Sequence, residues 1–277
     1  MRVLVVGSTG VVGRRLVPLL EAVGHEVTCP AHPPARAVTE AAPEAVVNLL
    51  TATERDFPAQ AAHTLYQAAQ RVGASRVLTQ SLAYAYQPGT GLADEDAPLW
   101  THRTPRRFAP VLHALLELER LTDEAGGLVL RYGHLYGPGS AYAPDGSFAA
   151  RVRARKVPLV GGGHSTLSFT HADDAATAVV AALDKDVTGV LNVVDDTPVT
   201  MHEFLPAYAA LLDAPVPRRV PAALARLTTG SWGAAFMNGL RGADNSRARR
   251  RLDWRPRHPS WRAGIQGTSL RAGQWEA

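Results

Sequence analysis

Short runs of apolar residues alternate with longer amphipathic stretches through the first half of the chain. The apolar runs cover residues 2–6, 26–29, 45–50, 76–81 and 128–131, and stretches with apolar residues at helical spacing cover 11–23, 59–72 and 110–125. Continuous apolar runs of this length are typical of strands buried on both faces of a parallel sheet. Their alternation with helices predicts βαβ units, and therefore an α/β fold with a doubly wound parallel sheet of the Rossmann type.

The pattern changes in the second half of the chain. A turn is expected at 136–139, a helix over 170–183 and a strand over 190–194, and the chain is mostly helical from residue 201 onward. We therefore expect a Rossmann core over residues 1–138. Residues 139–277 are expected to form a mixed region that completes the fold and builds a smaller, mostly helical substrate lobe. Within the core, residues 30–43 are expected to be a loop, because the consecutive prolines Pro33 and Pro34 disfavour regular structure.

A glycine-rich loop joins the first expected strand to the first expected helix, and it reads Gly7-Ser8-Thr9-Gly10-Val11-Val12-Gly13. In this context the glycines allow a tight turn, a close approach of the backbone to a pyrophosphate, and close packing of the helix on the sheet. The helix N-terminus adds free N–H groups and the positive end of the helix dipole. The loop therefore predicts that residues 1–138 bind a dinucleotide, with contacts from Gly7, Thr9, Gly10, Val11, Val12 and Gly13.

The end of the second expected strand bears on the choice of dinucleotide. An NAD site typically has a carboxylate there for the ribose 2′-hydroxyl, whereas arginine suits a 2′-phosphate. Here no carboxylate occurs between Cys29 and Glu40, and Arg14, Arg15 and Arg36 are placed to meet a phosphate. The sequence therefore favours NADPH, and NADH stays possible.

Charge and composition exclude several other classes. The 277-residue chain carries a net charge of +4, but its arginine clusters at 151–156 and 247–251 lack interleaved aromatic residues, so we expect no nucleic-acid partner. No apolar run approaches the roughly 20 residues of a membrane span, and no signal peptide precedes the glycine loop, so a cytoplasmic protein without a membrane partner is expected. The lone Cys29 allows no internal disulfide and indicates no metal site.

Further motifs add a family resemblance that covers nearly the whole chain. They are Val46-Val-Asn-Leu-Leu-Thr51, Arg76-Val-Leu-Thr-Gln-Ser81, Arg131-Tyr-Gly-His-Leu-Tyr-Gly-Pro-Gly139, Ser168-Phe-Thr-His-Ala-Asp-Asp174, residues 189–193 and residues 245–254. With the glycine loop, they resemble the extended and atypical short-chain dehydrogenases/reductases of the NAD-dependent epimerase/dehydratase type. The resemblance implies a nicotinamide cofactor with contacts from Leu49, Leu50, Thr51, Gln80, Tyr132, Gly133 and His134, and a catalytic serine at Ser81.

One departure from that family changes the expected chemistry. Its members use a Tyr-x-x-x-Lys pair, in which the tyrosine donates a proton and the lysine lowers the pKa of the tyrosine. This chain has no tyrosine between Tyr86 and Tyr132 and no lysine before Lys156. With Glu119 as the anchor for the helix, the positions of the pair fall at Val111 and Leu115, which are apolar.

Hydride transfer alone does not require that pair. Ser81 could polarise a substrate carbonyl, and Tyr84, Trp232 and Phe236 suit a large, flat, hydrophobic aromatic substrate. A phenol beside the carbonyl could supply the missing proton. The sequence therefore predicts an oxidoreductase, an NAD(P)H-dependent ketoreductase of aromatic polyketides, which resembles the atypical ketoreductases of angucyclinone antibiotic biosynthesis. A cyclase, dehydratase or isomerase that retains the dinucleotide, and a dinucleotide-binding redox sensor, remain as alternatives, and the oligomeric state is left open.

Overall fold

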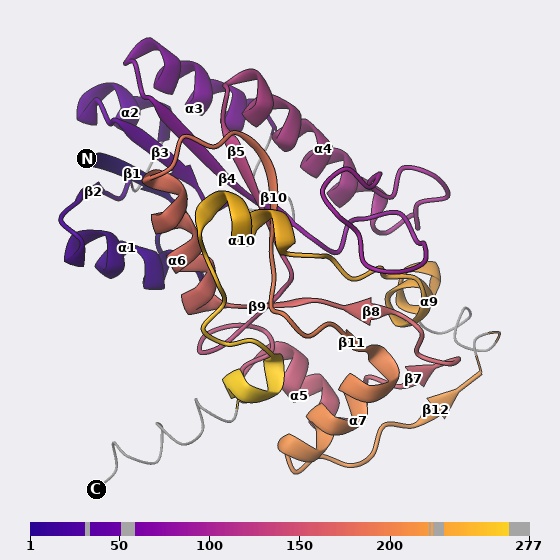
Figure 1. The fold of residues 1–277 in the computed structure, drawn as a ribbon. Coiled ribbons are helices and arrows are strands. Elements are labelled where there is room, and N and C mark those ends of the chain that lie inside the picture. The colour runs from indigo at the N-terminus through magenta and orange to yellow at the C-terminus, as the bar shows by residue number, and fades with distance from the viewer. Residues whose placement is uncertain (31–33, 51–58, 222, 224–229, 266–277) are drawn as a thin grey trace, which may run out of the picture.

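The computed structural model describes residues 1–30, 34–50, 59–221, 223 and 230–265. A six-stranded parallel sheet forms the centre of the molecule (Figure 1). Its strand order is β10-β5-β4-β3-β1-β2. The strands are β1 (Arg2–Val6), β2 (Glu26–Thr28), β3 (Ala45–Asn48), β4 (Arg76–Leu82), β5 (Leu128–Tyr132) and β10 (Gly189–Val193). The expected doubly wound α/β sheet is therefore confirmed.

Helices cover both faces of this sheet. Helices α1 (Gly13–Ala22), α6 (Ala172–Leu183) and α10 (Ser246–Leu252) lie on one face, and α2 (Pro34–Ala41), α3 (Ala59–Arg71) and α4 (Ala109–Glu124) lie on the other (Figure 1). Each face has its own apolar core: Leu16 and Leu20 of α1 pack in one, and Leu65 of α3 packs in the other. Strands buried from both sides explain why their sequences are continuous apolar runs.

Helix α2 corrects one expectation. Residues 30–43 were expected to be a loop, but Pro34–Ala41 form a helix whose Val38 is buried in the core under α3. Pro34 is the first residue of this helix, where proline is tolerated because the N–H group it lacks would have no partner in the helix. Pro34 therefore begins a helix instead of preventing one.

The second half of the chain contributes β10, α6 and α10 to the sheet region and builds a lobe beside it. This lobe contains α5 (Ser147–Arg153), α7 (Met201–Leu211) and α9 (Gly230–Asn238). Three short strand pairs connect the parts: β6 (His134–Tyr136) with β9 (Phe169–His171), β7 (Leu159–Val160) with β12 (Arg219–Val220), and β8 (Thr166–Leu167) with β11 (Val199–Thr200). A third apolar core, rich in aromatic side chains, joins the lobe to the ends of β4 and α4.

Candidate active site

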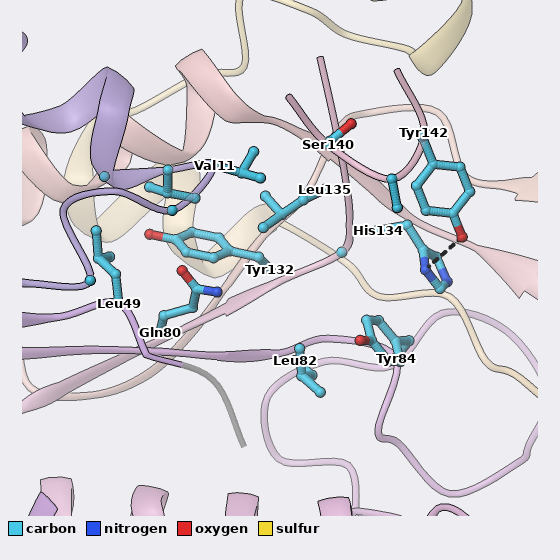
Figure 2. Close-up of a pocket in the computed structure, with 16 residues that line it drawn as sticks. Val11, Leu49, Gln80, Leu82, Tyr84, Tyr132, His134, Leu135, Ser140 and Tyr142 are labelled. Carbon is cyan, nitrogen blue, oxygen red and sulfur yellow. Dashed lines mark hydrogen bonds between the residues drawn. The ribbon is translucent and has the colours of Figure 1, made fainter. Parts of the chain in front are cut away.

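A cavity of about 260 Å³ lies where the chain leaves β1, β3, β4 and β5. In the sheet, β2 lies on one side of β1 and β3 lies on the other, so the chain crosses over β1 when it passes from β2 to β3. The cavity lies at this point, where ligands of open α/β folds bind. Figure 2 shows it running from the glycine loop and Leu49 to a group of rings at Tyr84, His134 and Tyr142. We call these two parts the glycine end and the reaction end.

The glycine end is shaped by backbone that has no room for side chains. Gly7 has a φ of +85°, and a Cβ atom on it would lie 3.2 Å from Leu49. A Cβ atom on Gly13 would lie 2.4 Å from the carbonyl oxygen of Gly7 and 2.6 Å from the backbone of Ser8. The close approach of α1 to this loop therefore requires glycine at residue 13, as the fingerprint predicts.

The middle of the cavity is lined by side chains of β4 and β5. Gln80 and Leu82 face it from β4, because side chains two residues apart on a strand point to the same side. The ring of Tyr132 lies between Gln80 and Leu135 in the cavity (Figure 2). Tyr132 is 1% exposed, and its hydroxyl donates to the Ala175 carbonyl at 3.4 Å. Burial raises the pKa of Tyr132, so its hydroxyl stays protonated.

The reaction end is built around His134. Its ring stacks on Tyr84 with a centroid distance of 4.5 Å, and the Tyr142 hydroxyl lies 3.3 Å from its Nδ1 (Figure 2). Burial lowers the pKa of His134 to about 3, so the imidazole is neutral at physiological pH. A neutral imidazole that accepts at Nδ1 carries its proton on Nε2.

Two polar atoms at the reaction end lack a partner. Among the residues that the structure describes, His134 Nε2 and Ser140 Oγ are buried without a hydrogen bond, and both residues line the cavity. Buried polar groups are normally satisfied, so these atoms indicate a ligand that hydrogen-bonds them. Together with the glycine loop, they fit a dinucleotide whose nicotinamide end reaches His134.

Ser81 does not face this cavity. Its hydroxyl donates to Glu119 Oε1 at 2.5 Å, and Glu119 also accepts from Arg131 Nε at 2.9 Å. Arg131 Nη1 in turn donates to the Tyr86 hydroxyl at 2.8 Å. All four residues are buried, Ser81 to 2% exposure. The residue predicted to polarise the substrate thus belongs to a buried polar network under α4, as does Tyr86.

The two helix positions to which the resemblance assigns the family's tyrosine and lysine have apolar surroundings in the structure. Val111 and Leu115 both lie on α4 and pack in the aromatic core of the lobe, with Leu115 1% exposed. Neither they nor His113, which is exposed on the same helix, lines the cavity. Helix α4 therefore offers no proton donor to the reaction end.

The remaining site residues divide clearly by position. The cavity is lined by ten of the predicted cofactor residues, namely Gly7, Gly10, Val11, Val12, Gly13, Leu49, Gln80, Tyr132, Gly133 and His134, and by Tyr84 from the predicted substrate set. Thr9, Arg14, Arg36 and Leu50 do not line it, and Thr51 lies outside the described residues. Sequence reasoning missed Leu82, Leu135, Ser140, Ala141 and Tyr142. Alternation along β4 could have found Leu82, but neither Leu135 of the short strand β6 nor the loop residues Ser140, Ala141 and Tyr142 carry such a signal.

The arginines predicted to favour NADPH have different settings. Arg14 Nε donates to the Thr9 carbonyl at 2.7 Å and so braces the glycine loop. Arg36 pairs with Glu40 at 2.8 Å on the exposed side of α2. Arg15 lies 3.4 Å from Asp173 of α6. Arg14 and Arg36 are both exposed.

A second cavity, of about 510 Å³, lies in the lobe and is lined by Trp232 and Phe236, the other predicted substrate residues. Phe236 also contacts the reaction end, because its ring centroid lies 5.7 Å from that of His134. Trp232 stacks on Phe108, just before α4, with a centroid distance of 4.4 Å. We call this second cavity the lobe cavity.

The fold and the glycine end are matched by a family model. The model of the NAD dependent epimerase/dehydratase family matches residues 3–193, from β1 to the end of β10. The chain belongs to this family. The resemblance inferred from the motifs is therefore confirmed.

Individual relatives extend the comparison. A 3-diazoavenalumate denitrifying reductase of Streptomyces sp is 44% identical over 302 residues, covering 96% of this chain and 99% of that protein. The structure of human epimerase family protein SDR39U1 with NADPH has a TM-score of 0.76 at 23% identity, covering 98% of this chain and 99% of that chain. A Thermotoga maritima UDP-glucose 4-epimerase with UDP-glucose has a TM-score of 0.76 at 18% identity and full coverage of both chains. The two structures support the fold, and the family together with the reductase supports an oxidoreductase.

The described residues were also compared with the features of a membrane span and of a metal site. Within the described ranges, no helix is long and apolar enough to cross a membrane. The described residues also include one group, His171, Asp173 and His258, whose ligand atoms lie within 4.8 Å of one another. The Nδ1 atoms of its two histidines already have protein partners: His171 Nδ1 accepts the Asp173 N–H at 3.2 Å, and His258 Nδ1 lies 3.0 Å from Asp174 Oδ2. We therefore assign these histidines to anchoring the chain after α10 against α6.

Proposed function

We propose that this protein is an NAD(P)H-dependent reductase that directs hydride to an aromatic substrate carrying a diazo group, with loss of N2. The observation that carries the proposal is the apolar pair Val111 and Leu115, where the family places its proton donor and the lysine that tunes it. A reaction that needs no proton from the protein suits such a site. The 44% identical relative, named a denitrifying reductase of a diazo compound, supports this choice.

The balance of the reaction explains why no donor is needed. An arenediazonium ion accepts hydride at its terminal nitrogen and becomes an aryldiazene, Ar–N=N–H. The C–N bond then breaks, N2 leaves, and the diazene hydrogen ends on the ring carbon. Overall, one arenediazonium and one hydride give one arene and one N2, with no net proton taken up or released.

The residues at the cavity then have limited tasks. The glycine loop holds the pyrophosphate, and Tyr132 and Gln80 border the nicotinamide, which supplies hydride when it is bound in reduced form. His134 Nε2 and Ser140 Oγ donate hydrogen bonds to the polar group of the substrate or to the nicotinamide carboxamide. Leu82, Tyr84 and Tyr142 exclude water from the reaction end and orient a flat ring.

An aromatic ketone beside a phenol is the second candidate. The two unpartnered donors at the reaction end would hold its carbonyl oxygen, and the substrate's own phenol would protonate the alkoxide. This candidate includes the polyketide ketoreductase and antibiotic-biosynthesis reading of the sequence. It requires a precise substrate geometry that the diazo reaction does not.

The test compares matched substrates. NADPH oxidation is followed by absorbance with arenediazonium salts and with aryl ketones that do or do not carry the neighbouring phenol, and N2 release is measured by mass spectrometry. Equimolar NADPH oxidation and N2 release support the diazo reaction. Turnover confined to phenol-bearing ketones would replace it by the second candidate, and cofactor binding without turnover on either series would contradict a reductase acting on these classes.

We also propose NADPH as the preferred cofactor. No carboxylate follows β2 before Glu40, and Arg14 and Arg36 are exposed. Arg14 also braces the glycine loop, so the test removes the other charge: an Arg36→Ala variant is expected to weaken NADPH binding about tenfold and to leave NADH binding unchanged. Equal losses for the two cofactors, measured by fluorescence titration, would contradict this preference.

A further inference from the structure

The lobe cavity combines three cations with an apolar, aromatic wall. Arg107, Arg151 and Lys156 line it together with Phe148, Val157, Pro158, Val160, Trp232, Gly233, Phe236 and Met237. The three cations are exposed, whereas Phe148, Val160 and Met237 are buried. They come from three separate stretches of the chain: the segment before α4, helix α5, and the segment after α5.

The three cations have no counter-charge from the described part of the protein. They share this with many of the other described arginines, whereas Arg247 pairs with Glu95 and Asp96, and Arg120 pairs with Glu117 and Glu124. Among the described residues, neither Arg107 nor Arg151 nor Lys156 forms an ion pair, and no acidic residue lines the cavity. Three like charges without counter-charges favour an anionic ligand.

The rest of the lining narrows the class of anion. No described residue that lines the lobe cavity carries a hydroxyl, amide or carboxylate side chain. A sugar nucleotide would bury many hydroxyl and base-edge groups there without side-chain partners, at a cost for each one. An aromatic acid would need only the cations for its carboxylate and the apolar wall for its ring.

Aromatic contacts join the lobe cavity to the reaction end. The ring of Phe236 lies 5.7 Å from His134, and the ring of Phe148 lies 4.7 Å from Tyr142. His134 and Tyr142 line the first cavity, and the two phenylalanines line the second. These rings pack against one another between the two cavities, so a single elongated molecule occupies both, with its reactive end at His134 and its far end among the cations, only when the side chains of Phe236 and Phe148 turn aside.

We propose that the lobe cavity binds the carboxylate end of the substrate, and that the substrate is an elongated aromatic acid held by Arg107, Arg151 and Lys156 against Trp232 and Phe236. This inference rests on the proposed function for the direction in which the substrate lies. Charge recognition at this distance from the reacting group sets which aromatic compounds are accepted. It takes no part in the hydride step.

The test is a binding measurement that needs no turnover. Cinnamate and cinnamamide have nearly the same shape and differ in charge, and both are titrated calorimetrically into the full-length protein saturated with NADP⁺. Cinnamate is expected to bind about tenfold more tightly than the amide. The triple variant Arg107→Gln/Arg151→Gln/Lys156→Gln should lower cinnamate binding to that of the amide and leave amide binding unchanged.

A second triple variant controls for net charge. Arg106→Gln/Arg155→Gln/Arg218→Gln removes the same charge from exposed positions that do not line the lobe cavity, and it should bind both probes as the unmodified protein does. Trp232→Leu should weaken the acid and the amide by the same factor, since it alters the wall and not the charge. Melting curves verify that each variant is folded.

Several results would overturn the inference. These are equal binding of acid and amide, no binding of either, or equal losses in the two triple variants. Tighter binding of UDP than of cinnamate, with the same dependence on the three cations, would assign the cavity to a nucleotide instead. Because the probes carry no diazo or keto group, charge-dependent binding would stand even if the turnover assay failed, and the reductase would stand if only this binding failed.

Discussion

The two ends of the cofactor cavity differ in whether backbone or side-chain atoms form their surfaces. At the glycine end, backbone atoms make the surface, and a Cβ atom on Gly13 would collide with the Gly7 carbonyl at 2.4 Å. At the reaction end, side chains make the surface, and rings of Tyr84, His134 and Tyr142 enclose it. The first end admits almost no variation, whereas the second can change with the substrate.

The reaction end contains two rings whose pKa values are shifted by burial. Burial lowers the pKa of His134 to about 3 and raises the pKa of Tyr84 to about 12. Both groups are therefore neutral near pH 7, and neither has a pKa matched to proton transfer there. The cavity has a glycine loop that fits a dinucleotide, and none of the described rings that line it has a pKa suited to donating a proton near pH 7. This difference is the reason to favour a reaction without net proton uptake.

The largest expected effect comes from breaking the glycine end. Gly13→Ala should weaken dinucleotide binding by about 100-fold or more, since the new Cβ atom displaces the loop that holds the pyrophosphate. Fluorescence titration with NADPH measures the change. Gly89→Ala is the matched control, because Gly89 has no positive φ and a Cβ atom there meets only the Arg241 side chain at 3.4 Å, and it should bind NADPH normally. Normal binding by Gly13→Ala would refute the assignment of this loop.

A smaller effect is expected at the reaction end. His134→Phe keeps the ring that stacks on Tyr84 but removes the Nε2 donor, so kcat should fall about 10- to 100-fold while NADPH binding is retained. His134→Gln places an amide donor near the same point and should recover part of the rate. Equal rates in the Phe and Gln variants would show that the donor has no role. Tyr142→Phe controls for the loss of the Nδ1 contact.

His134 is also expected to make the stability of the protein depend on pH, in a direction that its lowered pKa determines. The folded pKa of His134, about 3, lies below the ordinary value of 6.5, so the unfolded chain binds this proton more readily. The contribution of His134 to stability is therefore complete above pH 6.5 and is lost as the pH falls toward 3. Urea unfolding at pH 7 and pH 5 should show a smaller drop in stability for His134→Phe than for the unmodified protein. An equal drop would contradict the low pKa.

Much of the fold follows from local sequence signals, and part of the site does not. The strands were predictable because burial on both faces leaves continuous apolar runs, and the glycine loop because backbone contact leaves only glycine. The lobe cavity was not predictable in this way. Arg107, Arg151 and Lys156 come from different segments, and only the apolar core shared by α5, α9 and the segment before α4 brings them to one cavity.

The direction of the Ser81 side chain could have been predicted from the alternation of side chains along a strand. Gln80 was predicted to contact the cofactor and Ser81 the substrate, although adjacent residues on a strand point to opposite faces. The structure places Gln80 at the cavity and Ser81 toward α4, where it meets Glu119. Applying the two-residue period to β4 favours Leu82 and Tyr84 as the neighbours of the substrate, and both line the cavity.

A variant at Ser81 therefore tests which side of β4 faces the substrate, and it has the smallest expected effect on activity. Ser81→Ala removes a hydrogen bond to the buried Glu119, which still pairs with Arg131, so the free energy of unfolding should fall by about 1–3 kcal/mol. The kcat/KM should stay within about twofold, because the hydroxyl does not face the cavity. Leu82→Ala is the matched variant on the opposite face of β4, and it should alter KM. A large loss of kcat in Ser81→Ala, with cofactor binding intact, would restore Ser81 as a catalytic residue and place the substrate on the α4 side of the sheet.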